Sequence, residues 1–133
     1  MRETKLKFSK KDRLPVMCLG QKNGYSLKGK LWVEGKNGIF LGYGRIVLLE
    51  RIKQYGSISK AAKSMKMAYR HAWDLVDSVN RQAMKPFVET ATGGKKGGGA
   101  ILTKHGEKAV EEFWKFHNNF KDFLCGETKK IEF

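Results

Sequence analysis

Residues 56–103 read GSISKAAKSMKMAYRHAWDLVDSVNRQAMKPFVETATGGKKGGGAILT and carry most of the information about the fold. Ser57 can begin a short helix over 57–66, because its hydroxyl can accept a hydrogen bond from a free amide of the first turn. Apolar residues then recur with the period of one buried helical stripe, which predicts a second helix over 68–84. The stripe consists of Ala72, Leu75, Val76, Val79 and Ala83. This stretch therefore predicts two helices joined by a tight turn.

A glycine- and lysine-rich loop at 93–99 separates two short apolar segments, 87–92 and 100–102, that we predict to be strands. Such a loop loses much conformational entropy on ordering, which favours a backbone that must come close to a partner. A Walker-type phosphate loop is not supported, because no serine or threonine follows a glycine-lysine pair at the required spacing. The pattern favours the wing of a winged helix-turn-helix, and a plain flexible hairpin is the alternative.

The flanking segments complete the predicted fold. Residues 27–41, LKGKLWVEGKNGIFL, predict a β-hairpin whose turn lies at Asn37-Gly38. Residues 45–55 predict a helix that ends at Gly56, and Thr103 can cap a last helix over 104–124. The fold class is thus α+β and mainly helical: a winged helix-turn-helix with an N-terminal β-hairpin and a long C-terminal helix.

The chain has 133 residues, the length of one domain. We expect this domain to span 27–124, after a basic N-terminal segment at 1–26 and before a tail at 125–133. No stretch approaches the 18 apolar residues of a membrane span, so we expect no membrane partner. The two cysteines lie far apart in the sequence, which favours reduced thiols and a cytoplasmic protein.

The net charge is +14, and it is unevenly distributed. Residues 1–41 carry 10 basic and 3 acidic groups, residues 42–105 carry 12 and 4, and residues 106–133 carry 5 and 6. Nucleic acid is the commonest partner of such a basic surface, and an anionic membrane is the second; with the predicted fold, we expect double-stranded DNA. The last segment, 106–133, is almost neutral, so we expect it to have a function other than binding the anionic partner.

Catalytic and metal-binding patterns are lacking. The three histidines form no H-E-x-x-H pattern, no G-x-S-x-G occurs, and neither cysteine has a second cysteine at metal-ligand spacing. We therefore expect no enzyme, no cofactor and no bound metal.

A helix-turn-helix places its second helix in the major groove of DNA, so the exposed face of the helix over 68–84 is the candidate reading surface. Trp73 is expected to pack in the core beside this face. The candidate recognition residues are Ala68, Tyr69, Arg70, His71, Asp74 and Ser78. The candidate contacts to the DNA backbone are Ser57, Ser59, Lys60 and Lys63. The candidate wing contacts are Gly94, Lys95, Lys96 and Gly97.

The last helix has more aromatic side chains than one protomer can cover. This excess predicts a homodimer interface, although a monomer with a broad core helix is the alternative. The candidate interface residues are Phe113, Trp114, Phe116, His117, Phe120 and Phe123.

Several short runs resemble the N-terminal DNA-binding domain of the ModE family of molybdate-responsive transcription regulators, whose winged helix is related to that of LysR-type regulators. The runs are Gly56-Ser57-Ile58-Ser59, Ala61-Ala62-Lys63, Met67-Ala68-Tyr69-Arg70, Ala72-Trp73, Thr92-Gly93-Gly94-Lys95, Gly97-Gly98-Gly99-Ala100 and Leu102-Thr103. The resemblance implies a dimer to which the first and last helices contribute, and a major-groove helix that starts at Ala68, where the family commonly has serine. Family members carry C-terminal molybdate-binding domains, and because this sequence ends at Phe133 we expect a stand-alone DNA-binding domain without molybdate binding.

Together these features predict a sequence-specific, dimeric DNA-binding transcription regulator. Two alternatives stay open: a non-specific nucleoid-type or RNA-binding protein that relies on charge alone, and a winged-helix module that binds another protein.

Overall fold

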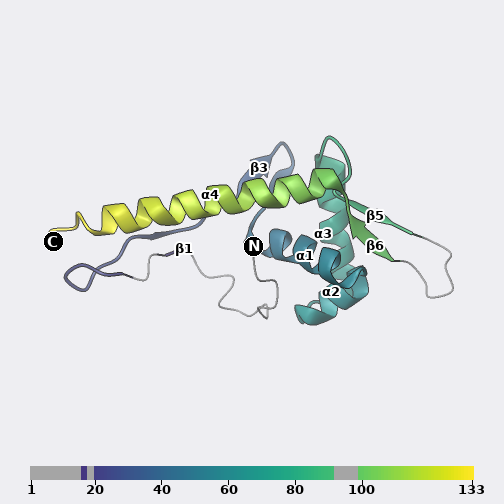
Figure 1. Cartoon of the computed structure of the whole chain (residues 1–133), viewed down its shortest axis with the longest axis horizontal. Coiled ribbons are helices and arrows are strands. Elements are labelled where there is room, and N and C mark those ends of the chain that lie inside the picture. The colour runs from purple at the N-terminus through teal and green to yellow at the C-terminus, as the bar shows by residue number, and fades with distance from the viewer. Residues whose placement is uncertain (1–15, 18–19, 92–98) are drawn as a thin grey trace.

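A computed structural model of the chain describes residues 16–17, 20–91 and 99–133. Its elements follow the predicted order, with two extra short strands at the start (Figure 1). The strands are β1 (Val16–Met17), β2 (Lys28–Gly29), β3 (Val33–Gly35), β4 (Gly38–Leu41), β5 (Val88–Thr90) and β6 (Ala100–Leu102). The helices are α1 (Tyr43–Tyr55), α2 (Ile58–Ser64), α3 (Tyr69–Gln82) and α4 (Lys104–Thr128). The prediction of a mainly helical α+β fold is confirmed.

Helix α1 lies at the centre of the fold. Its residues Ile46, Leu48, Leu49 and Ile52 are buried, because α2, α3, α4 and β6 all pack around this helix. A helix covered on most sides needs apolar residues in consecutive positions rather than on one stripe. Gly56 ends α1 in a left-handed conformation with φ of 68°, as predicted, and its amide donates to the Ile52 carbonyl.

Helices α2 and α3 form the predicted helix-turn-helix. The hydroxyl of Ser57 accepts a hydrogen bond from the Lys60 amide at 3.1 Å, which confirms Ser57 as the N-cap of α2. The turn closes at Lys66, which has a positive φ of 53°, and at Met67, whose amide donates to the Ala62 carbonyl at 2.9 Å. Small buried side chains at Ala61 and Ala62 let α2 approach its neighbours closely.

The strands of the predicted wing form an antiparallel pair in which Val88 faces Leu102 and Thr90 faces Ala100. A hydrogen bond of 2.9 Å from the Ala100 amide to the Gly56 carbonyl anchors β6 to the end of α1. The wing strands run out on one side of the helical body, at the N-terminal end of α4 (Figure 1). The arrangement of α2, α3, β5 and β6 is that of a winged helix-turn-helix.

The predicted N-terminal hairpin is present but shorter than expected. Strands β3 and β4 pair with Gly35 opposite Gly38, so Lys36 and Asn37 form the turn and Gly38, with φ of 104°, follows it. Strand β2 lies within the predicted hairpin range but pairs instead with β1, which the sequence did not reveal.

Helix α4 begins as predicted, with the Thr103 hydroxyl accepting from the Gly106 amide at 3.0 Å. It ends at Thr128 rather than at 124, and so extends into the predicted tail. The buried Thr128 hydroxyl accepts from the Leu27 amide at 2.9 Å. The C-terminal half of α4 therefore runs beyond the helical body beside the N-terminal strands (Figure 1).

The prediction of reduced cysteines is wrong for Cys125, which is disulfide-bonded in α4, while Cys18 lies outside the described residues. The distance along the sequence was misleading because β1 packs against α4 in three dimensions. In the part of the chain that the structure describes, every helix is too short or too polar to cross a membrane.

Candidate nucleic-acid interface

The N-terminal half of α3 protrudes from the protein. Tyr69, Arg70, Trp73 and Asp74 are exposed, and Ala72 is the buried residue that attaches this half to the core. His71 is exposed as well, and Ala68 is exposed at the N-cap position. A helix that presents its first two turns in this way can enter a groove about as wide as the helix itself, such as the major groove of DNA.

Arg70 has the most exposed charged side chain of this surface, with 87% of its side-chain area accessible. Its Nε lies 3.5 Å from Oδ1 of Asp74, one turn further along α3. An exposed ion pair of this kind contributes little to stability, so Arg70 can exchange Asp74 for another acceptor at small cost. A guanine edge offers two such acceptors in the geometry of a guanidinium group.

The prediction that Trp73 packs in the core is wrong, because 44% of its surface is exposed. The buried stripe of α3 runs through Ala72, Val76 and Val79, and Trp73 is about 100° around the helix from Ala72. Tyr69 lies one turn before Trp73 on the same flank and is 55% exposed. The N-terminal half of α3 thus presents two aromatic side chains as well as its polar ones.

Ser78 occupies a different place from the other candidate recognition residues. Its hydroxyl accepts from Nη1 of Arg45 at 3.1 Å and from Nε2 of Gln82 at 3.2 Å. Arg45 belongs to α1, and burial lowers the pKa of its guanidinium group from the ordinary value. Ser78 therefore joins α3 to α1 within the protein, and its side chain is only partly exposed.

The candidate backbone contacts lie on and before α2. Ser59, Lys60 and Lys63 are exposed, whereas Ser57 is partly buried and uses its hydroxyl to cap α2. Within the described ranges neither lysine forms an ion pair. This differs from α3, where Arg70 pairs with Asp74 and Arg81 pairs with Asp77 at 2.9 Å. The uncompensated positive charge accordingly lies beside α3 rather than on it.

The candidate wing residues, Gly94, Lys95, Lys96 and Gly97, lie outside the described residues. The strands that carry them are firmly attached. The Ala91 amide donates to the Gly99 carbonyl at 2.9 Å, which continues the β5–β6 ladder by one step towards the tip.

Sequence reasoning missed Asn80, which joins the reading helix to the wing. Its Oδ1 accepts from the amides of Phe87 at 2.9 Å and Val88 at 3.1 Å, and its Nδ2 donates to the Val88 carbonyl at 2.9 Å. Because Phe87 and Val88 are 97% buried, these amides have no access to water and depend on Asn80. An asparagine near the end of a helix, shortly before a proline, was the signal available in the sequence.

The candidate dimer residues of α4 differ in how far they are exposed in one protomer. Phe113 is 99% buried within the protomer and has no surface left for a partner, so its assignment to the interface needs correction. Phe120 contacts the backbone at Gly29 in β2. Phe116 and Phe123, in contrast, are 52% and 57% exposed.

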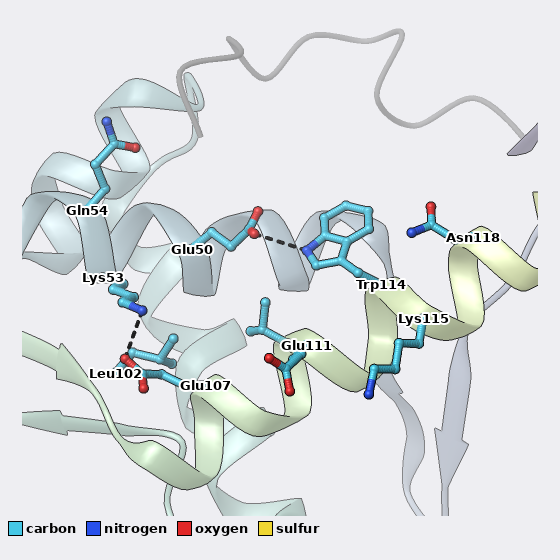
Figure 2. Close-up of a pocket in the computed structure, with 10 residues that line it drawn as sticks. Glu50, Lys53, Gln54, Leu102, Glu107, Glu111, Trp114, Lys115 and Asn118 are labelled. Carbon is cyan, nitrogen blue, oxygen red and sulfur yellow. Dashed lines mark hydrogen bonds and ion pairs between the residues drawn. The ribbon is translucent and has the colours of Figure 1, made fainter. Parts of the chain in front are cut away.

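Trp114 lies at the edge of a groove of about 740 Å³ between α1 and α4 (Figure 2). Its Nε1 donates to Oε2 of Glu50 at 3.0 Å, and its ring stands edge-on to those of Tyr43 and His117. At the other end of the groove Lys53 of α1 pairs with Glu107 of α4 at 2.9 Å (Figure 2). The groove is open and lined by both helices.

Comparison with known proteins gives a consistent set of relatives, although no protein-family model matches the chain. The chain is 38% identical over 81 residues to the transcriptional regulator ModE of Haemophilus influenzae, covering 61% of this chain and 32% of that protein. It is 42% identical over 73 residues to the DNA-binding transcriptional dual regulator ModE of Escherichia coli, covering 55% and 28%. It is 42% identical over 78 residues to the molybdenum-pterin-binding protein MopB of Rhodobacter capsulatus, covering 59% and 29%.

The matched region thus spans about a third of the length of these relatives. The match confirms the resemblance to ModE-family regulators.

Proposed function

We propose, from the similarity of this chain to ModE-family regulators, that it is a DNA-binding transcription regulator that recognises a specific duplex sequence as a homodimer. The observation that carries the proposal is the exposed N-terminal half of α3, held at the end of a helix-turn-helix. We also propose that the protein acts in the cytoplasm, in the same compartment as the DNA.

The distribution of charge supports different DNA contacts for α2 and α3. Charged side chains on α3 are balanced by ion pairs between residues one turn apart, whereas Lys60 and Lys63 on α2 carry unbalanced charge. Base edges on the floor of a groove are uncharged, and the phosphates lie on its rims. We therefore assign base contacts to Tyr69, Arg70, His71 and Asp74, and phosphate contacts to Ser59 and the two lysines.

The wing completes this interface in the proposal. Lys95 and Lys96 are assigned to phosphates or to the adjacent minor groove, because β5 is fixed to α3 through Asn80 and β6 to α1 through Gly56. Gly94 and Gly97 are assigned to close approach of the backbone to the DNA, because glycine has no Cβ atom.

The proposed dimer uses the groove between α1 and α4 and the exposed aromatic residues of α4. Helix α4 has 25 residues, and Phe116 and Phe123 remain exposed on it in one protomer. Trp114 borders the groove, whereas Phe116 lies on another face of α4, beside Phe40 and Ala109, so the proposed partner would contact more than one face of this helix. Covering such apolar surface is the usual driving force for a symmetric pair, and a symmetric pair reads two half-sites.

Selection of bound duplexes from a random pool, at about 150 mM salt to weaken non-specific binding, tests the proposal. We expect enrichment of one motif with two-fold symmetry. An unenriched pool whose binding disappears as the salt concentration rises would support the non-specific nucleic-acid binder instead. A protein that binds no duplex would support a protein-interaction module. Sedimentation equilibrium of the same sample tests the dimer separately.

A further inference from the structure

We propose that Trp73 reads thymine by packing against the C5-methyl group of that base in the major groove. This inference rests on the proposed function and deepens it, because it assigns an apolar specificity contact to a helix otherwise described by its polar side chains. The residue is a specificity determinant and not part of the scaffold.

The position of Trp73 supports this assignment. Trp73 lies seven residues, about two helical turns, before Asn80, so the two residues share one flank of α3. Asn80 is hydrogen-bonded to the start of β5, which shows that this flank faces the side of the wing. Trp73 is therefore on the exposed half of α3, on the side where the wing and the reading helix would both contact one duplex.

The chemistry of Trp73 matches a methyl group better than a phosphate. The residue is 44% exposed, and in the described part of the chain its ring pairs with no other aromatic ring and its Nε1 has no hydrogen-bond partner. Neither an aromatic pair nor a hydrogen bond among the described residues therefore accounts for a large apolar side chain that is nearly half exposed at this position. Thymine is the base that presents an apolar group in the major groove.

The neighbouring charges favour DNA as the occupant rather than another protein. Arg70 lies about one turn before Trp73 on α3, and Lys63 and Lys66 are exposed on α2 and in the turn between the helices. Positive groups that surround an apolar side chain suit an apolar feature on the floor of a groove with phosphates along its rims.

The experiment uses the full chain and the duplex selected above. Each thymine of the duplex is replaced in turn by deoxyuridine, which removes the C5-methyl group and keeps the base pair. Affinities are measured for the wild-type protein, Trp73→Ala and Trp73→Phe. Trp32→Ala is the matched control, because Trp32 is similarly exposed, at 48%, but lies before the N-terminal hairpin.

We expect deoxyuridine at one thymine of each half-site to weaken wild-type binding about fourfold, the value of one buried methyl group. The same replacement should not change the affinity of Trp73→Ala. For Trp73→Phe it should cause a smaller loss of affinity than for the wild type. Trp32→Ala should behave as the wild type. Circular dichroism of each variant confirms that it is folded.

Two results would overturn the inference and leave the proposed function intact. One is a selected motif in which deoxyuridine has the same effect on the wild type and on Trp73→Ala. The other is a Trp73→Ala protein that binds as tightly as the wild type to every duplex. A wild-type chain without any sequence preference would overturn the inference and the proposed function together.

Discussion

Replacing Gly106 by alanine should destabilise the protein, although glycine is normally the weaker residue inside a helix. Gly106 lies in the first turn of α4 against the start of β5, and a Cβ atom there would be 2.6 Å from the Phe87 carbonyl oxygen and 2.7 Å from Cδ1 of Leu102. Ordinary contacts are at least 3.4 Å, so the helix must move by most of an ångström. The nearest atom belongs to the backbone and cannot rotate away.

The expected magnitude follows from two opposing effects. Alanine gains about 1 kcal/mol of helix propensity over glycine. Forcing an extra carbon atom into a packed site costs about 1–3 kcal/mol, and contact with a fixed backbone atom favours the upper end of that range. We expect a net loss of about 1–2 kcal/mol in the free energy of unfolding, or a fall of roughly 5 °C in Tm for a domain of this size.

Gly126 provides the matched control in the same helix. A Cβ atom at Gly126 meets nothing within 4 Å, so Gly126→Ala should stabilise the protein by about 0.5 kcal/mol, with the gain reduced by its position near the end of α4. Both variants are unfolded in urea at one protein concentration and followed by circular dichroism, because the proposed dimer would make stability depend on concentration. If Gly106→Ala proved as stable as Gly126→Ala, the close packing of α4 on β5 would be refuted.

The other predictions concern the N-cap of α3, the hydrogen bonds of Asn80, a proposed DNA contact and the proposed dimer interface. Ala68→Ser should raise the free energy of unfolding by about 1 kcal/mol in thermal denaturation, because Ala68 is the extended, exposed N-cap of α3 and makes no capping hydrogen bond. Asn80→Ala should lower it by about 2–4 kcal/mol by leaving two buried amides unpaired, and Asn80→Asp, which keeps both acceptor bonds, should lower it less. Arg70→Ala should weaken binding to the selected duplex by about 1–3 kcal/mol without changing Tm, since Arg70 is exposed. Phe123→Ser should shift the sedimentation equilibrium towards monomer while the far-ultraviolet spectrum stays unchanged, because this ring is mostly exposed in the protomer.

Local signals in the sequence predicted much of the helical fold. Ser57 and Thr103 begin helices because their hydroxyl groups accept from amides three residues later, and Gly56 ends a helix because it adopts a positive φ easily. Each of these effects acts within one helical turn, so a residue and its neighbours suffice to predict it. The apolar stripe of α3 could also be predicted from the sequence, since the buried residues Ala72 and Val79 follow the helical period.

Contacts between distant segments were not predictable in this way. The pairing of β1 with β2, the packing of β1 against α4 and the disulfide bond of Cys125 all join residues that are far apart in the sequence or lack a local signal. Trp73 shows a subtler limit. Its large apolar side chain suggested the core, but burial is decided by the angle around the helix, and the core of α3 was already filled by smaller residues on the neighbouring stripe.

The reading surface is held in place mainly by polar contacts at its edges. Helix α2 has only seven residues and would not be stable alone, so its position comes from packing on α1. Asn80 ties α3 to β5 with three hydrogen bonds, and the Gly56 carbonyl ties β6 to the end of α1. Hydrogen bonds are directional, whereas apolar packing tolerates sliding, so these ties fix the angle between the reading helix and the wing. The proposed binding of a single duplex by both α3 and the wing requires that angle to be constant, and this requirement explains why buried polar contacts lie between two elements that an apolar core alone could have joined.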